Sequence, residues 1–239
     1  MTPAAYAMLI NLCCRHDNAE EALKLKMELA RKDSEVALDA QKYVALVRVL
    51  SKHGKLEEAI DMLKEMKEKD VQLRDSTISL LTLTMNTAAM KGDANSIRRL
   101  QETIFTLGLA KPSSNLCSPL ITCYLESGNY AGAFDATVEV HKQYNQMPKI
   151  HDLICGLVEK GDAELLQKVV EFLSQERGEM MMLYDLYFAF LQTGRYKEAR
   201  KIIEVGLLLL CSIHTANLTA KAASHESTLP LRNSSDKAI

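Results

Sequence analysis

The segment "GKLEEAIDMLKEMKEKD", residues 54–70, carries the clearest pattern in this chain. Its apolar residues recur at helical spacing and would share one helix face: Leu56, Ala59, Ile60, Leu63 and Met66. The preceding segment, "KYVALVRVLSKHG" at 42–54, has a second such stripe and ends in Gly54, which can adopt the left-handed conformation that closes a helix. The sequence therefore predicts two antiparallel helices, each with an apolar face that it cannot bury alone.

This pattern returns along the chain. The residues that match Gly54 are Asp17, Gly92, Gly128, Gly161 and Gly194, at successive spacings of 37, 38, 36, 33 and 33 residues. Aspartate tolerates left-handed backbone better than most residues, so Asp17 can take the place of glycine. A small or modest apolar residue follows five positions after each turn: Ala22, Ala59, Ile97, Ala133, Leu166 and Ala199. Six such units predict an all-α fold, a right-handed α-solenoid of antiparallel helix pairs, with a single globular bundle as the alternative.

The predicted array spans residues 2–206, with units near 2–37, 40–75, 76–113, 114–148, 149–179 and an incomplete one at 180–206. Residues 207–239 lack the period, and their Ser, Thr, Asn and Ala content predicts a disordered tail. The apolar segment "GLLLLCSI" at 206–213 either caps the last pair or stays exposed. It is too short to cross a bilayer, so we predict no membrane span.

Composition limits the classes of function. The formal net charge of -2 gives no global basic field, so any nucleic-acid binding must be local. Six cysteines form no Cys-x-x-Cys pair, and we interpret them as small buried hydrophobes of a reducing compartment: Cys13, Cys14, Cys117, Cys123, Cys155 and Cys211. The N-terminal residues have neither the apolar core of a secretory signal nor the Arg-rich bias of a transit peptide.

Enzyme signatures are missing from the sequence. It contains no phosphate-cradling glycine loop, no Gly-x-Ser-x-Gly elbow and no His-Glu-x-x-His motif. His141 and His151 are too isolated to indicate a metal site. We therefore predict a protein that is not an enzyme and that needs no cofactor.

Residues 43–73, "YVALVRVLSKHGKLEEAIDMLKEMKEKDVQL", resemble the pentatricopeptide repeat, including "GKLEEA" and the closing "MKEK". The segment "ETIFTLGLAKPS" at 102–113 is similar to the end of such a repeat, whereas the Trp and Leu-Gly pattern of tetratricopeptide repeats is missing. The resemblance implies binding of single-stranded RNA, one base per repeat, on the concave face of the array.

The leucine-rich, loosely spaced units most resemble the mitochondrial members of this family. That resemblance implies that the chain is a fragment of a longer array which supports mitochondrial mRNA stability and translation. It also implies a mitochondrial location, with the nucleus as a second one, and a small RNA-recognition-motif protein as partner.

The resemblance also implies which residues would contact RNA. The fifth position of each unit falls at Ala7, Val44, Thr82, Ser118, His151 and Tyr184. Base readers in the family carry a hydrogen-bonding side chain there, so Thr82 and Ser118 are candidates, whereas Val44 could only pack against a base. Asp75 fits the closing position if one extra residue is allowed. A cation two positions before the turn lies near a phosphate in the family, and Arg15 and Lys52 match it.

Other interpretations of these residues remain open. Arg15 and Lys52 can be solvated charges near helix ends, where cations suit the helix dipole. In the fourth and fifth units Glu126 and Glu159 reverse the charge, which favours a scaffold for protein partners as the alternative function. We expect the methionines at 180–182 to fill the core of the sixth unit.

Overall fold

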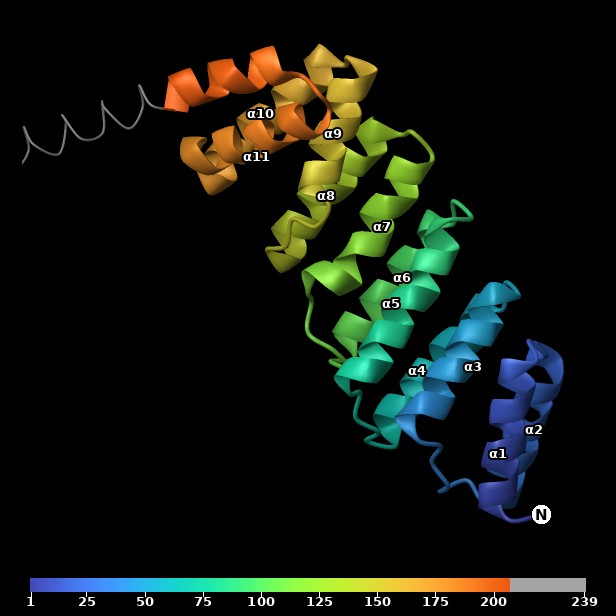
Figure 1. Cartoon of the computed structure of the whole chain (residues 1–239). Helices are drawn as coiled ribbons and strands as arrows, with labels where there is room; N and C mark the ends of the chain where they lie inside the picture. Colours follow the sequence, from blue (N-terminus) through green and yellow to red (C-terminus); the bar gives the residue numbers. More distant parts are fainter. Residues whose placement is uncertain (207–239) are drawn as a thin grey trace, which may run out of the picture. The chain divides into compact units, whose positions relative to one another are not determined.

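A computed structural model describes residues 1–206 of the chain as helices joined by short connections, with no strand in that part (Figure 1). The helices are α1 (Pro3–Arg15), α2 (Ala19–Lys32), α3 (Ala40–Lys52), α4 (Leu56–Glu68), α5 (Asp75–Ala89), α6 (Ala94–Thr106), α7 (Ser114–Glu126), α8 (Tyr130–Tyr144), α9 (Ile150–Lys160), α10 (Ala163–Arg177) and α11 (Glu179–Gln192). A further helical segment covers 196–206. The tail predicted at 207–239 lies outside the described residues.

The chain divides into two compact units, Met1–Leu157 and Val158–Ile239. In the first unit α1 packs against α2, α3 against α4, α5 against α6 and α7 against α8, so the first four predicted helix pairs form (Figure 1). The first helices also stack in chain order, α1 on α3, α3 on α5 and α5 on α7. The main packing thus joins each hairpin to its neighbours, as in a repeat array. The all-α fold of antiparallel pairs is confirmed, and the right-handed superhelix stays a prediction.

The turn between paired helices has one conformation throughout the described repeats. Gly54, Gly92, Gly128, Gly161 and Gly194 have φ between 69° and 75°, and Asp17 takes their place with φ 61°. A Cβ added to Gly54 would meet nothing within 4 Å, so glycine serves the backbone conformation and not a close approach. The prediction of turns from the glycine spacing, including the replacement at Asp17, is confirmed.

The residue after the turn caps the second helix. Asn18, Asp93, Asn129 and Asp162 each accept a hydrogen bond from the backbone N–H three residues later, at 2.9–3.1 Å. This bond satisfies one of the amides that a helix start leaves unpaired. In the second hairpin Lys55 occupies the cap position of α4 and provides no side-chain bond.

The core of the second hairpin is almost wholly apolar. Residues of α3 and α4 with at most 1% exposure fill it: Tyr43, Val44, Leu46, Val47, Val49, Leu50, Ala59, Leu63 and Met66. The apolar stripes of the sequence thus face each other and the neighbouring hairpins. Such burial is the main force that stabilises short helices, which are marginal alone.

Lys26, Tyr43 and Glu65 form a hydrogen-bonded polar cluster beside this core. Lys26 of α2, only 4% exposed, donates to Glu65 Oε1 of α4 at 2.7 Å. The Tyr43 hydroxyl donates to the same oxygen at 2.9 Å, and burial raises the Tyr43 pKa well above its usual value. Three helices from two hairpins therefore meet at one carboxylate.

Exposed ion pairs also join the second helices of neighbouring hairpins, α4, α6 and α8. Arg99 of α6 pairs with Glu57 of α4, and Arg98 of α6 pairs with Glu139 of α8. Hydrogen bonding to Arg99 lowers the Glu57 pKa, so the pair is charged at neutral pH. Both guanidinium groups lie on an exposed helix face, and both also join neighbouring hairpins.

The second unit is described from residue 158 to residue 206. Its α10 packs against α11, with Val169, Leu173, Leu183 and Leu186 buried. Arg177 at the end of α10 pairs with Asp185 of α11 at 2.8 Å. The expectation that the methionines at 180–182 fill the core is wrong for Met180 and Met181, which are both exposed.

The cysteines of the described part are free thiols: Cys13, Cys14, Cys117, Cys123 and Cys155. All of these except Cys13 are buried, which agrees with the prediction of small hydrophobes. Burial raises the pKa of Cys14 and of Cys117 to about 11. Cys211 lies outside the described residues.

Candidate nucleic-acid interface

A small hollow lies between α3 and α5, toward the ends of the two helices. Its volume is about 210 Å³, and its lining residues are Arg48, Ser51, Lys52, Thr84, Thr87, Ala88, Lys91 and Asp93. We call it the cationic hollow, because Arg48, Lys52 and Lys91 bring three positive charges to it. Asp93 is its one acid, and its carboxylate is engaged as the N-cap of α6. The local balance is therefore positive, although the whole chain is slightly negative.

Existing contacts hold the cations of the hollow in place. Lys52 forms an ion pair with Asp17, the turn residue of the first hairpin, and this hydrogen bond lowers the Asp17 pKa. Lys91 Nζ donates to the backbone carbonyl of Lys52 at 3.2 Å. Arg48 donates to the carbonyl of Cys14 at 3.5 Å, a long contact. All three cations are thus positioned by backbone or side-chain partners in adjoining hairpins.

Ser51 gives the hollow a neutral donor. It lines the hollow, and its buried hydroxyl oxygen makes no hydrogen bond within the described structure. A buried hydroxyl without a partner is costly, so such groups are usually satisfied by water or by a ligand. A phosphate oxygen would satisfy it while also meeting the cations.

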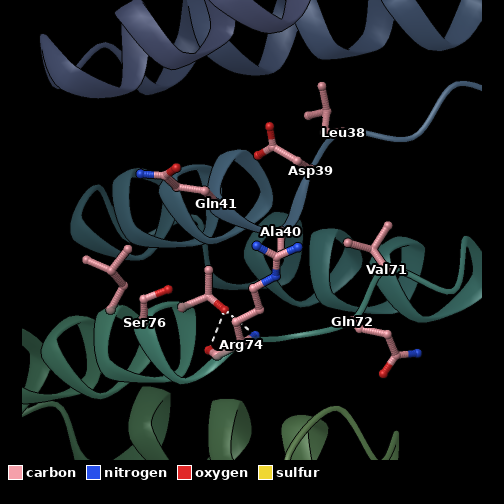
Figure 2. Close-up of a pocket in the computed structure, with 10 residues that line it drawn as sticks. Leu38, Asp39, Ala40, Gln41, Val71, Gln72, Arg74 and Ser76 are labelled. Carbon is pink, nitrogen blue, oxygen red and sulfur yellow. Dashed lines mark hydrogen bonds between the residues drawn. The ribbon is translucent and has the colours of Figure 1, made fainter.

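A larger hollow of about 580 Å³ lies at the starts of the same two helices (Figure 2). We call it the amide hollow; its lining residues are Leu38, Asp39, Ala40, Gln41, Val71, Gln72, Arg74, Ser76, Thr77 and Leu80. Figure 2 shows the guanidinium of Arg74 extending from the start of α5 toward Ala40 at the start of α3. Amide, guanidinium and hydroxyl groups supply the donors and acceptors that the edges of unpaired bases require.

The predicted reading residues have different surroundings. Val44 is 1% exposed and belongs to the core, so its side chain offers no surface to a base. Thr82 and Ser118 are half-buried, and their hydroxyls donate within their own helices, to the carbonyls of Ile78 at 3.1 Å and Asn115 at 3.0 Å. Such local bonds are common for these residues and leave the hydroxyl only as an acceptor.

The remaining predicted residues lie at the surface. Asp75 is exposed as the first residue of α5, next to Arg74 and Ser76 of the amide hollow. Arg15 is exposed at the end of α1, whereas Lys52 lines the cationic hollow. The predicted residues therefore lie in several places, and of these residues Lys52 lines the cationic hollow.

Sequence reasoning missed several lining residues. Arg48 lies one helical turn before Lys52, so the spacing of four could have placed both on one face. Ser51 carries no charge pattern, and only its buried environment distinguishes it. Arg74 and Gln41 come from separate hairpins, and their proximity depends on how the hairpins stack.

Within the described residues no group of His, Cys, Asp and Glu is arranged to hold a metal ion. None of the helices in residues 1–206 combines the length and apolar content that a membrane crossing requires.

Comparison with known proteins identifies the repeats. A family model described as "PPR repeat" matches residues 4–34 and 43–71. The leucine-rich PPR motif-containing protein, mitochondrial, of Xenopus tropicalis is 58% identical over 83% of this chain, and that of Mus musculus is 57% identical over 85%. The chain spans only 14% and 15% of these two relatives. The matches indicate a helical-repeat protein rather than an enzyme.

One solved structure in the comparison is the PPR domain of Arabidopsis thaliana protein-only RNase P 1 in complex with tRNA. It is 18% identical to this chain, with a TM-score of 0.45, and the match covers 72% of this chain and 89% of that one.

Proposed function

Because this chain belongs to the pentatricopeptide-repeat family, we propose that it binds single-stranded RNA through the face formed by α3 and α5. The observation that carries the proposal is the cationic hollow, where three cations surround a hydroxyl without a partner. We assign the backbone phosphate of the RNA to this hollow. The amide hollow at the other end of the same helices would receive an unpaired base.

The physical basis is electrostatic. Each phosphate that a protein neutralises releases condensed counterions, which supplies most of the affinity for nucleic acid without sequence preference. Arg48 and Lys91 donate to backbone carbonyls, and Lys52 pairs with one carboxylate, that of Asp17. Because these partners already hold the three side chains at the hollow, little rearrangement is needed to contact a phosphate. Reading of bases adds hydrogen bonds to unstacked base edges.

In this proposal the chain acts by staying bound to the RNA and not by catalysing a reaction on it. An RNA held extended along the repeats is shielded from nucleases and from pairing with itself, which would support mitochondrial mRNA stability and translation. The relatives carry "mitochondrial" in their names, and this supports a mitochondrial location for the chain. The proposal also includes a nuclear location and a small RNA-recognition-motif partner, and both of these rest on the family resemblance alone.

The proposal can be tested with labelled oligouridine, long enough to supply one nucleotide per repeat, and fluorescence anisotropy. We expect Arg48→Glu together with Lys52→Glu to weaken binding at least about tenfold, because the substitutions reverse two charges in the hollow. Lys64→Glu together with Lys67→Glu on α4 is the matched control, since both lysines are exposed, lie outside both hollows and give the same change of net charge. Circular dichroism checks that each variant stays folded.

Two outcomes would reject the proposal. The first is no binding by the wild-type chain at low salt. The second is an equal loss of affinity in the control with Lys64→Glu and Lys67→Glu, which would show that the net charge of the chain and not this hollow determines binding.

A further inference from the structure

The turn of the first hairpin carries an acidic residue where the matching turns carry glycine. Asp17 adopts the same left-handed backbone as Gly54 and Gly92, with φ 61° against 74° for both glycines. Asparagine tolerates this backbone as well as aspartate does, and glycine adopts it without steric cost. The conformation of the turn therefore does not require a carboxylate, and the contacts of the Asp17 side chain indicate what the acid does.

The Asp17 carboxylate pairs with two side chains at the end of α3. One oxygen accepts a hydrogen bond from Lys52 Nζ, and the other lies 3.4 Å from His53 Nε2. The hydrogen bond from Lys52 contributes most to lowering the Asp17 pKa, and the charge of His53 adds to it. Arg15 and His16 precede Asp17 in the sequence and are exposed. In the described structure the carboxylate thus meets the second hairpin and not these two neighbours.

The three cations of the cationic hollow differ in what already balances their charge. Arg48 and Lys91 donate to backbone carbonyls, which are neutral and leave both positive charges uncompensated. Lys52 meets a full negative charge, because Asp17 reaches it from outside the lining of the hollow. An ammonium group donates charge-assisted hydrogen bonds to a carboxylate and to a phosphate alike, so the two anions compete for one cation.

We propose that Asp17 is an internal competitor of the RNA phosphate: it holds Lys52 in the free chain and so limits the affinity of the cationic hollow. The inference rests on the proposed function, because the competing ligand is the phosphate assigned to this hollow. When Lys52 turns to a phosphate, the Asp17 carboxylate retains His53 as its neighbour at 3.4 Å. The exchange therefore replaces one ion pair by another and leaves the carboxylate with a hydrogen-bonding partner.

The ion pair also joins the first two hairpins, but we expect its contribution to stability to be small. The side chains of Lys52 and Asp17 are 50% and 43% exposed. Ion pairs with this exposure contribute little to stability, because water solvates both charges when they are apart. Removal of the carboxylate should thus leave the helices intact while it releases Lys52.

The test compares Asp17→Asn with the wild type in the binding of labelled oligouridine, measured by fluorescence anisotropy. Asparagine keeps the size of the side chain and the backbone of the turn but removes the charge. We expect the affinity to rise about threefold, since an exposed ion pair no longer competes with the phosphate. Asp17→Gly, which gives the turn the residue of the matching hairpins, should produce the same rise. Asp61→Asn on α4 is the matched control, because Asp61 pairs with Lys64 outside both hollows and the change of net charge is the same.

A second background separates competition for Lys52 from general repulsion of the RNA. Lys52→Ala removes the contested cation, so Asp17→Asn added to it should raise the affinity by less than in the wild type. An equal or larger rise in the Lys52→Ala background would overturn the inference. An unchanged affinity of Asp17→Asn, or a rise equal to that of Asp61→Asn, would overturn it as well.

Tripolyphosphate distinguishes failure of this inference from failure of the RNA proposal. It carries phosphate groups without sugar or base, and isothermal titration calorimetry measures its binding to the unlabelled chain. If oligouridine does not bind the wild type, the RNA proposal is rejected and tripolyphosphate alone decides the inference. Tighter binding of tripolyphosphate to Asp17→Asn than to the wild type and to Asp61→Asn supports the competition, whereas equal binding or none overturns it.

Discussion

Single residues set the local geometry of each hairpin, and Lys55 differs from Asn18, Asp93, Asn129 and Asp162 because its side chain does not cap the helix that follows the turn. Its backbone, with φ -88° and ψ 64°, closely matches that of Asp93, which does cap its helix. The second hairpin is thus built for a cap that its side chain does not provide. The resemblance of residues 43–73 to the repeat does not reveal that the N-cap bond of α4 is missing, because that bond depends on the single side chain at position 55.

We predict that Lys55→Asn stabilises the protein by about 1 kcal/mol, because the amide oxygen can accept from the backbone N–H of Glu58. Asparagine is chosen because it adds no acid beside Glu57 and Glu58. Lys55→Ala is the control, since it removes the same charge without adding a cap. Urea denaturation followed by circular dichroism measures the difference, and equal stability of the two variants would contradict the prediction.

The buried thiols provide a second test at the scale of residues. Cys14 and Cys117 have a pKa of about 11, two units above the ordinary value of 9.0. At pH 8 each then holds about a hundredfold less thiolate than an ordinary cysteine, and burial also excludes the reagent. We predict that iodoacetamide modifies Cys13 well before Cys14 and Cys117, as measured by peptide mass spectrometry. Comparable rates at the adjacent Cys13 and Cys14 would contradict the packing.

Pairs of helices are held together by a few polar links across apolar surfaces. Glu65 of α4 receives hydrogen bonds from Lys26 of α2 and Tyr43 of α3. No periodicity in the sequence predicts that these three residues meet, because Lys26 is 39 residues and Tyr43 is 22 residues from Glu65. The spacing of apolar residues predicts which face of a helix is covered, but the partners of a polar residue depend on the stacking.

We predict that Glu65→Ala destabilises the protein by about 3 kcal/mol, because it leaves the Lys26 cation buried without a partner. Asp61→Ala on the same helix is the matched control and should change stability by less than about 0.5 kcal/mol, since its pair with Lys64 is exposed. Both values come from urea denaturation. If the two substitutions lowered the free energy of unfolding by similar amounts, the buried hydrogen bonds of Glu65 would contribute no more to stability than an exposed ion pair does.

At the scale of the whole molecule, a repeated hairpin is what the sequence predicts best. The glycine spacing and the apolar stripes fix the turns and the helices, because both depend on neighbours in sequence. The binding surfaces are harder to predict, because they depend on which faces remain uncovered. Met180 and Met181 show this: flexible apolar side chains are typical of a core, yet the structure exposes both of them.

The two units also differ in the chemistry of their exposed residues. The first unit carries the cationic hollow of α3 and α5, whereas α11 of the second unit exposes Met180, Met181, Tyr184 and Phe188. An array of repeats permits this, since each hairpin contributes its own surface with little effect on distant ones.

The salt dependence of RNA affinity tests the central claim most directly. For single strands the slope of log affinity against log salt changes by about 0.7 for each phosphate contact. We predict that Lys52→Ala makes the slope shallower by about that amount, whereas Lys64→Ala leaves it unchanged. A slope that is the same in the wild type and in Lys52→Ala would contradict the assignment of a phosphate to the cationic hollow.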